Sequence, residues 1–199
     1  NNPTSTAITR KDMRKILDRA MQFGISVIVD ETYEEFTDAG SKISSIPLTN
    51  NYNNLIVLRG ISKFFAAPGL RLGYAVTGNP DLLKYINTKK NPWTINSLAE
   101  IAGCIMFSDK EYIEKTRALI TSERNRLYEL MSTWEHVKVY PSCSNFLLVK
   151  ILREDVTSEM VFDHCIRKGL MIRDCSTFPF LDNSFIRFCI MSPEKNDEL

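Results

Sequence analysis

The sequence predicts an α/β fold, because a helical segment leads into a short apolar strand and two more strands of the same kind follow. The apolar runs are residues 25–29, 55–58 and 72–76, and the first is rich in β-branched residues, which suits a strand covered on both faces. Helices that alternate with such strands favour a mostly parallel sheet. The amphipathic segment at 110–134 changes the pattern, so we expect a smaller α+β region beyond it.

The first helix is predicted by signals at both of its ends. Thr9 and Asp12 stand three residues apart, as in a helix N-cap, and Gly24 is well placed to end the helix. Between them, one helical face is apolar: Met13, Ile16, Leu17, Ala20 and Met21.

Later elements follow from the same kinds of signal. Asn79 and Pro80 predict a helix start, and Gly169 predicts a helix end. The long segment at 110–134 could bridge two domains. The other predicted helices are 97–107 and 158–167, and the predicted strands of the second region are 137–140, 145–151 and 185–190.

Composition argues against several classes of protein. The chain has 25 Lys and Arg residues and 24 Asp and Glu residues, which gives a net charge of +1. No strong electrostatic field of the whole chain would therefore attract nucleic acid or an anionic membrane. No apolar run reaches the ~18 residues of a membrane span. The sequence has five cysteines without a CxxC pair and only two histidines, so we expect a reduced, cytoplasmic protein without a metal site. Because no Met begins the chain, we also expect it to start inside a longer protein.

Polar side chains follow the predicted strands of the first region. Asp30 directly follows the first strand and Tyr33 lies three residues on, while Ser62 and Lys63 follow the second strand and Arg71 precedes the third. Since α/β proteins bind ligands at the carboxyl edge of the sheet, we expect these side chains to converge on one rim.

The same residues stand in strings that resemble a known family. Asn2-Pro3-Thr4, residues 29–33 (Val-Asp-Glu-Thr-Tyr) and residues 62–74, which run from Ser-Lys to Arg-Leu-Gly-Tyr, resemble in order and spacing the motifs of class I/II aminotransferases. Segments 144–148, 172–176 and 185–187 are similar to those of histidinol-phosphate aminotransferases and threonine-phosphate decarboxylases. The resemblance implies the fold of the pyridoxal-phosphate-dependent transferases. Residues 1–107 would form part of the large cofactor-binding domain and 108–199 the smaller α+β C-terminal domain, incomplete at its end.

The resemblance also implies a cofactor, pyridoxal 5'-phosphate, and a role for each matched residue. Lys63 would be the catalytic residue that bonds covalently to the cofactor aldehyde and later moves a proton as a base. Asp30 would keep the ring nitrogen protonated, and Arg187 would bind the substrate carboxylate through a two-pronged contact. The other cofactor contacts would be Asn2 and Tyr33 at the phenolate oxygen, and Ser62 and Arg71 at the phosphate.

Two positions depart from the family pattern, and much of the family's length is absent. Ser5 stands where the family usually has glycine, and Gly60 stands where it has a hydroxyl residue, which removes one phosphate donor. Family members are about twice as long and form homodimers. We therefore expect the 199-residue chain alone to bind the cofactor weakly or not at all, and to be inactive.

Three functions stay open on the sequence. The first is amino transfer between an amino acid, or a phosphorylated amino alcohol, and a 2-oxo acid. The second is a lyase like the threonine-phosphate decarboxylases, and the third is a catalytically inactive module of this fold that binds or dimerises. Taken singly, Lys63 could be a surface charge, Asp30 a turn residue, Tyr33 a packing residue, and Arg71 and Arg187 surface ion pairs.

Several other residues are expected to be structural. His136 and His164 are isolated in the sequence, and the five cysteines look like small core residues. Arg173 and Asp174 favour a surface pair, although Arg173 could be a second contact for an acidic or phosphorylated substrate.

Overall fold

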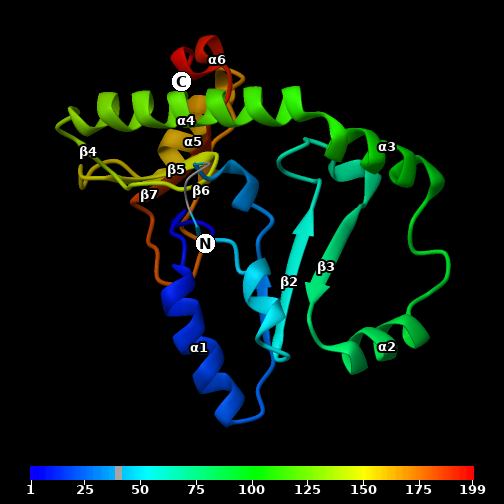
Figure 1. Cartoon of the computed structure of the whole chain (residues 1–199). Coiled ribbons are helices and arrows are strands. Elements are labelled where there is room, and N and C mark those ends of the chain that lie inside the picture. Colours follow the sequence, from blue (N-terminus) through cyan, green and yellow to red (C-terminus); the bar gives the residue numbers. More distant parts are fainter. Residues whose placement is uncertain (39–41) are drawn as a thin grey trace. The chain divides into compact units, whose positions relative to one another are not determined.

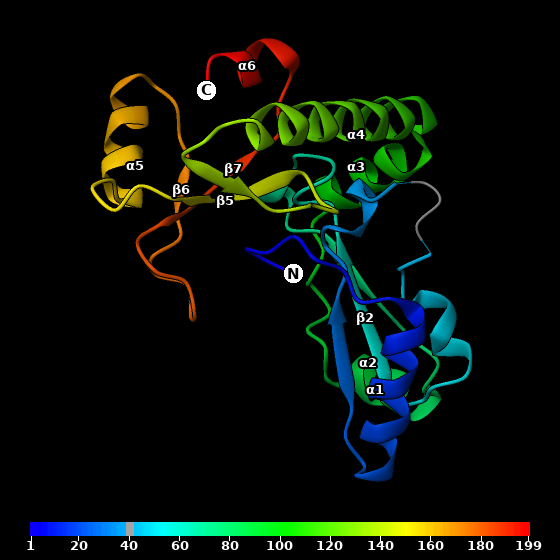
Figure 2. The same cartoon turned by 90° about the vertical axis from the view of Figure 1, so that its left-hand side faces the viewer.

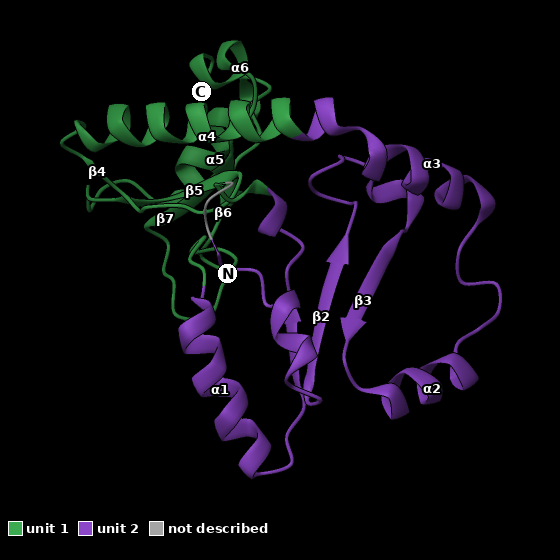
Figure 3. Cartoon of the chain, viewed as in Figure 1, with its two compact units in different colours: residues 1–7, 36–39, 114–199 green, residues 8–35, 40–113 purple. Residues whose placement is uncertain are grey.

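The computed structural model of the protein describes residues 1–38 and 42–199, and the chain forms two compact units (Figure 3). Unit 1 consists of Asn1–Ala7, Phe36–Ala39 and Glu114–Leu199, and unit 2 of Ile8–Glu35 and Gly40–Ile113. Both units combine helices with a sheet, which confirms the predicted α/β class. The predicted domain division at residues 107 and 108 stays a prediction about the whole protein.

Unit 2 contains a mixed three-stranded sheet in the order β1-β2-β3. β1 (Val27–Asp30) pairs in parallel with β2 (Leu55–Gly60), and β2 pairs antiparallel with β3 (Gly73–Thr77). The opposite directions of β2 and β3 are visible in Figure 1. The three predicted strands therefore form one sheet, as expected, but within this chain the sheet is mixed rather than mostly parallel, because β3 pairs antiparallel with β2.

The core of unit 2 lies on one face of this sheet. Met13 and Leu17 of α1 (Arg10–Gln22) pack with Leu48, Leu55 and Val57, and Leu17 is fully buried. Val27 and Val29 of β1 contact the same cluster.

The expectation that the first strand is covered on both faces is wrong for this chain. Burial alternates along β1, and Ile28, which points away from the core, is 63% exposed. Val27 and Val29 reach the α1 core because they lie on the opposite face of the strand. The strand also begins later than predicted, at Val27.

The predicted caps of α1 are confirmed. The Thr9 side chain accepts a hydrogen bond from the Asp12 amide at 3.1 Å and donates one to the Asp12 carboxylate at 2.7 Å. Gly24, just after the helix, has a φ of +64°, a conformation that side-chain-bearing residues rarely adopt. Asn79 likewise caps α2 (Pro80–Lys89) by accepting from the Leu82 amide at 3.0 Å.

The third helix of unit 2, α3 (Ser97–Ser108), is close to the predicted range. Gly103 allows it to approach Leu72, because a Cβ at Gly103 would lie 2.5 Å from the Leu72 side chain. Much of α3 is apolar and exposed, including Leu98, Ile101 and Ile105. These three residues are spaced to share one helical face.

Unit 1 contains an antiparallel four-stranded sheet in the order β4-β5-β7-β6. Its strands are β4 (Val137–Val139), β5 (Phe146–Ile151), β6 (Arg173–Asp174) and β7 (Phe185–Cys189). The helices are α4 (Lys110–Ser132), whose first residues belong to unit 2, α5 (Ser158–Arg167) and α6 (Pro193–Asp197). Figure 2 shows α4 running along this sheet.

The α5 helix has the predicted bounds, and Gly169 follows it with a φ of +78°, as expected of a helix end. The short strand β6 was not predicted, because two residues show no alternation that could reveal a strand. The expectation that the cysteines are small core residues holds for Cys165 and Cys175, which are buried. It is wrong for Cys104, Cys143 and Cys189, which are exposed.

Among the described residues, none of the helices is both long and apolar enough to span a membrane.

Candidate active site

The sheet of unit 2 gathers the predicted site residues at one edge. Asp30, the last residue of β1, is paired with Leu58, so the carboxyl ends of β1 and β2 lie side by side. The segment with Ser62 and Lys63 leaves β2 at this edge. Because β3 runs in the opposite direction and begins opposite Gly60, Arg71 enters β3 at the same edge.

Lys63 lies on an exposed turn directly after β2, close to Tyr33. Its ammonium nitrogen is 5.9 Å from the centre of the Tyr33 ring. The Ala66 amide donates to the Lys63 carbonyl at 3.1 Å, and Ala66 has a φ of +49°, so the main chain turns sharply after the lysine. The structure therefore brings Lys63 and Tyr33 together, as the spacing predicted.

Asp30 has one carboxylate oxygen engaged within its own loop. That oxygen accepts from the Thr32 amide at 2.9 Å and from the Thr32 hydroxyl. The side chain is exposed at the end of β1. Thr32 thus orients the carboxylate, while the residue stays accessible to a ligand.

Arg71 is held in an unusual backbone conformation at the start of β3. Its φ is +56°, and its guanidinium donates to the Pro68 carbonyl at 3.0 Å. The side chain is exposed, and Ser62 beside Lys63 is half-buried. A guanidinium and a hydroxyl are suitable donors for a phosphate at this edge.

Sequence reasoning missed a cluster of charges that ties the segment after β1 to strand β2. The Arg59 guanidinium contacts the carboxylates of Glu31 at 2.8 Å, Glu34 at 2.9 Å and Glu35 at 2.5 Å. The Arg59 side chain is 9% exposed and that of Glu31 is 6% exposed. Burial by itself would lower the pKa of Arg59, but the charges of Glu34 and Glu31 outweigh it and raise that pKa.

The position of the cluster explains its importance for the site. Arg59 lies on β2 four residues before Lys63, and its three partners lie on the segment that contains Tyr33 and follows Asp30. Glu31 also accepts from the Ser44 hydroxyl at 2.9 Å. The segment that carries Tyr33 is therefore tied by one guanidinium to the end of β2, from which the Lys63 turn leaves.

The other two predicted site residues, Asn2 and Arg187, contact each other within unit 1. The Arg187 guanidinium donates to the Asn2 side-chain oxygen. Ser5 has a φ of +56°, a backbone conformation that favours glycine, and its hydroxyl is 2.7 Å from that of Ser142. A partly buried hydrogen bond thus accompanies the strained backbone.

Arg173 lies directly opposite Arg187 in the β6–β7 pair, so both side chains stand on one face of the sheet. They line a cavity of about 610 Å³, which also contains the acidic residues Glu159, Asp163 and Asp174. The Arg187 Nε atom is buried and has no hydrogen-bond partner among the described residues. The register across β6 and β7 was not visible in the sequence, so the pairing of these arginines was missed.

The residues of unit 2 fit the chemistry of pyridoxal phosphate. An amine, a carboxylate and a guanidinium stand at one edge, with the phenol of Tyr33 next to the amine. Among the described residues, no group of three or more His, Cys, Asp or Glu is arranged to hold a metal ion. The individual roles of these residues stay predictions.

The model of the family "aminotransferase class I and II" matches residues 1–199, and the chain belongs to this family. It is similar to the histidinol-phosphate aminotransferase of Thermoanaerobacter pseudethanolicus, with 39% identity over all of this chain and 53% of that protein. It is also 36% identical to a putative threonine-phosphate decarboxylase of Caldanaerobacter subterraneus subsp. tengcongensis, over 98% of this chain and 53% of that protein.

The fold has a counterpart among solved structures. The histidinol-phosphate aminotransferase from Clostridium acetobutylicum superposes with a TM-score of 0.92 at 34% identity, covering 100% of this chain and 59% of that one. The chain spans about half the length of the curated relatives it matches. The expected fold, that of the pyridoxal-phosphate-dependent transferases, is thereby confirmed.

Replacing Arg59 tests the charge cluster. Arg59→Met should leave three carboxylates facing one another at low exposure, and should lower the free energy of unfolding by about 3–5 kcal/mol, as removal of one partner from a buried ion pair does. Urea unfolding measures the change. The matched control is Arg14→Met on the exposed side of α1, which should change stability by less than about 0.5 kcal/mol. Equal stability of the two variants would show that the cluster does not hold the loops.

Proposed function

We propose that the whole protein containing this chain is a pyridoxal-phosphate-dependent aminotransferase. It would transfer an amino group between an amino acid, or a phosphorylated amino alcohol, and a 2-oxo acid. The observation that supports this most is the meeting of Lys63, Asp30 and Arg71 at one edge of the sheet. Membership of the aminotransferase family supports the same reaction class.

Each side chain has a task that its chemistry suits. Lys63 would hold the cofactor at its aldehyde group, and its amine would move a proton to and from the substrate α-carbon. Asp30 holds a proton on the ring nitrogen, and Thr32 keeps the Asp30 carboxylate in one orientation. When bound, pyridoxal phosphate supplies an electron sink for bond cleavage at the α-carbon.

The remaining contacts position the cofactor and the substrate. Ser62 and Arg71 would bind the phosphate and Tyr33 would donate to the phenolate oxygen, a role that the family resemblance also implies for Asn2. Arg187 binds the substrate carboxylate, for which a planar guanidinium gives two parallel hydrogen bonds.

The pair of Arg173 and Arg187 suggests a substrate with strong negative charge. Like charges at opposite positions of paired strands repel each other, and an anion bound in the cavity that Arg173 and Arg187 line would reduce this repulsion. The buried Nε of Arg187, which has no partner among the described residues, is a donor suited to such an anion. A carboxylate or a phosphate of the substrate satisfies both requirements.

The alternative is decarboxylation of a phosphorylated amino acid. It is favoured by the similarity to a putative threonine-phosphate decarboxylase and by the same arginine pair. Both reactions use the same cofactor contacts, and they differ in which bond of the α-carbon stands perpendicular to the cofactor ring.

Lys63→Ala tests the proposed reaction in the whole protein supplied with pyridoxal phosphate. The variant should lose keto acid formation from amino acids by at least about 10³-fold, because no other amine replaces the proton carrier. Formation of keto acid indicates amino transfer, whereas carbon dioxide released from phosphothreonine indicates the alternative. The matched control is Lys84→Ala on the exposed face of α2, which should keep full activity. Full activity of Lys63→Ala would refute the mechanism.

Gly60→Ser tests whether the missing hydroxyl weakens phosphate binding. A Cβ at Gly60 would lie 3.4 Å from the Leu72 carbonyl, an ordinary contact, so serine should fit. We expect pyridoxal phosphate to bind the whole protein several-fold more tightly, since one added hydrogen bond contributes about 1 kcal/mol. Fluorescence titration measures this. The control Gly73→Ser should instead destabilise the fold, because its Cβ would lie 2.9 Å from the Arg59 carbonyl. Unchanged or weaker binding in Gly60→Ser would contradict the proposal.

We also propose that the whole protein is a homodimer in the cytoplasm that uses small amino acid and oxo acid substrates. Support for association comes from the apolar face of α3, where Leu98 is 73% and Ile105 is 64% exposed. Sedimentation equilibrium of the whole protein should give twice the chain mass. A monomer at micromolar concentration would contradict the dimer.

A further inference from the structure

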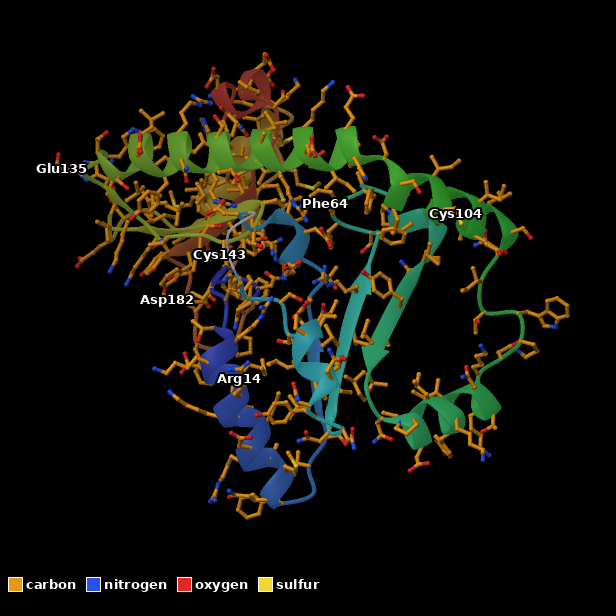
Figure 4. The ribbon with its side chains drawn as sticks, in the orientation of Figure 1. Arg14, Phe64, Cys104, Glu135, Cys143 and Asp182 are labelled. Atoms are coloured by element: carbon orange, nitrogen blue, oxygen red, sulfur yellow. The ribbon has the colours of Figure 1, made fainter. Side chains whose placement is uncertain are left out.

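The main chain around Lys63 needs support from outside its own loop. Lys63 stands in a turn between β2 and β3, where no helix or strand fixes its backbone. Phe64, the next residue, is 2% exposed and lies just beyond the end of β2 in Figure 4. The contacts that fix Phe64 therefore also fix the backbone of Lys63, to which the lysine side chain is attached.

Tyr112 holds the carbonyl of this residue. Its hydroxyl donates a hydrogen bond to the Phe64 carbonyl oxygen at 2.9 Å, across 48 residues of sequence. Tyr112 lies in the first turn of α4, and its backbone amide donates a hydrogen bond to a carboxylate oxygen of Asp109 at 2.9 Å. The donor is therefore fixed on a regular helix, while the acceptor lies on an irregular loop.

The ring of Tyr112 contacts the same loop. It stacks on Phe65 with ring centres 5.7 Å apart and an angle of 17° between the planes. It also meets Phe64 edge to face at 6.1 Å, and Phe65 in turn contacts Phe107 at 5.5 Å. Both residues that follow Lys63 are thus held by one tyrosine, through its ring and through its hydroxyl.

We infer that Tyr112 is a positioning residue, whose hydroxyl fixes the Lys63 turn so that the lysine amine meets the cofactor aldehyde. This inference rests on the proposed function. Tyr112 would not touch the cofactor or the substrate, and would act only through the backbone of Phe64. The two roles of Tyr112 can be separated, because phenylalanine keeps the ring contacts and removes only the hydroxyl.

The size of the effect follows from the geometry of bond formation. A displacement of about 1 Å in a reacting group can cost on the order of 10²-fold in rate. Loss of one hydrogen bond to the loop should shift the Lys63 amine by less than about 1 Å. We therefore expect a decrease of about 5- to 20-fold in covalent attachment of the cofactor to Lys63.

The experiment compares two cofactor forms in the whole protein. Pyridoxal phosphate at a limiting concentration is trapped on Lys63 by brief borohydride reduction and quantified by peptide mass. Pyridoxamine phosphate, which has no aldehyde, reports binding that does not need the Lys63 amine. The variant is Tyr112→Phe, and the matched control is Tyr85→Phe on α2, where the tyrosine is 62% exposed.

The inference predicts a 5- to 20-fold loss of trapping in Tyr112→Phe, with pyridoxamine phosphate affinity within about twofold of the original protein. Tyr85→Phe should match the original protein in both measurements. Undiminished trapping in Tyr112→Phe would overturn the inference. So would a parallel loss of trapping and of pyridoxamine phosphate affinity, which indicates a purely structural role.

Hydrogen exchange separates failure of this inference from failure of the proposed function. The Ala66 amide, which bonds to the Lys63 carbonyl, should exchange about tenfold faster in Tyr112→Phe than in Tyr85→Phe. If the original protein traps no pyridoxal phosphate, the proposed function fails and the cofactor role of Tyr112 fails with it. Faster exchange would then still establish that Tyr112 holds the turn, and unchanged exchange would refute that as well.

Discussion

The candidate site depends on the pairing of three short strands. β1 and β2 run in parallel, so the segments that leave them emerge at the same edge, and β3 returns antiparallel and begins there. This arrangement alone brings an acid, an amine and a guanidinium from three separate stretches of sequence to one place. If β1 and β2 were antiparallel, Asp30 would lie at the opposite end of the sheet from Lys63.

Strand pairing brings the loops to the same edge, and two further interactions fix them there. Arg59 binds the glutamates that flank Tyr33, at a cost in desolvation that apolar residues would not incur. Tyr112 holds the turn after Lys63 from the first turn of α4. Each contact fixes a segment that follows a strand of the sheet, the one after β1 for Arg59 and the one after β2 for Tyr112. A reactive amine needs such support because its reaction is sensitive to small displacements.

Local signals in the sequence predicted the parts of the fold that depend on neighbouring residues. Thr9 and Gly24 marked the ends of α1, because caps and positive φ angles are short-range requirements. The pairing of Arg173 with Arg187 and the Arg59 cluster were missed, because each depends on strand register or on contacts between distant segments. The exposure of Ile28 was missed because an apolar run gives no sign of which face the chain covers. Family resemblance, rather than periodicity, identified Lys63 among the many lysines.

The central claim is that Lys63 binds the aldehyde group and Asp30 the ring nitrogen of the same pyridoxal phosphate molecule. A crystal structure of the whole protein grown with pyridoxal phosphate tests this most directly. The account predicts continuous density between the Lys63 amine and the cofactor, with the Asp30 carboxylate within hydrogen-bond distance of the ring nitrogen. Cofactor bound to a different lysine, or a ring nitrogen that faces away from Asp30, would contradict it.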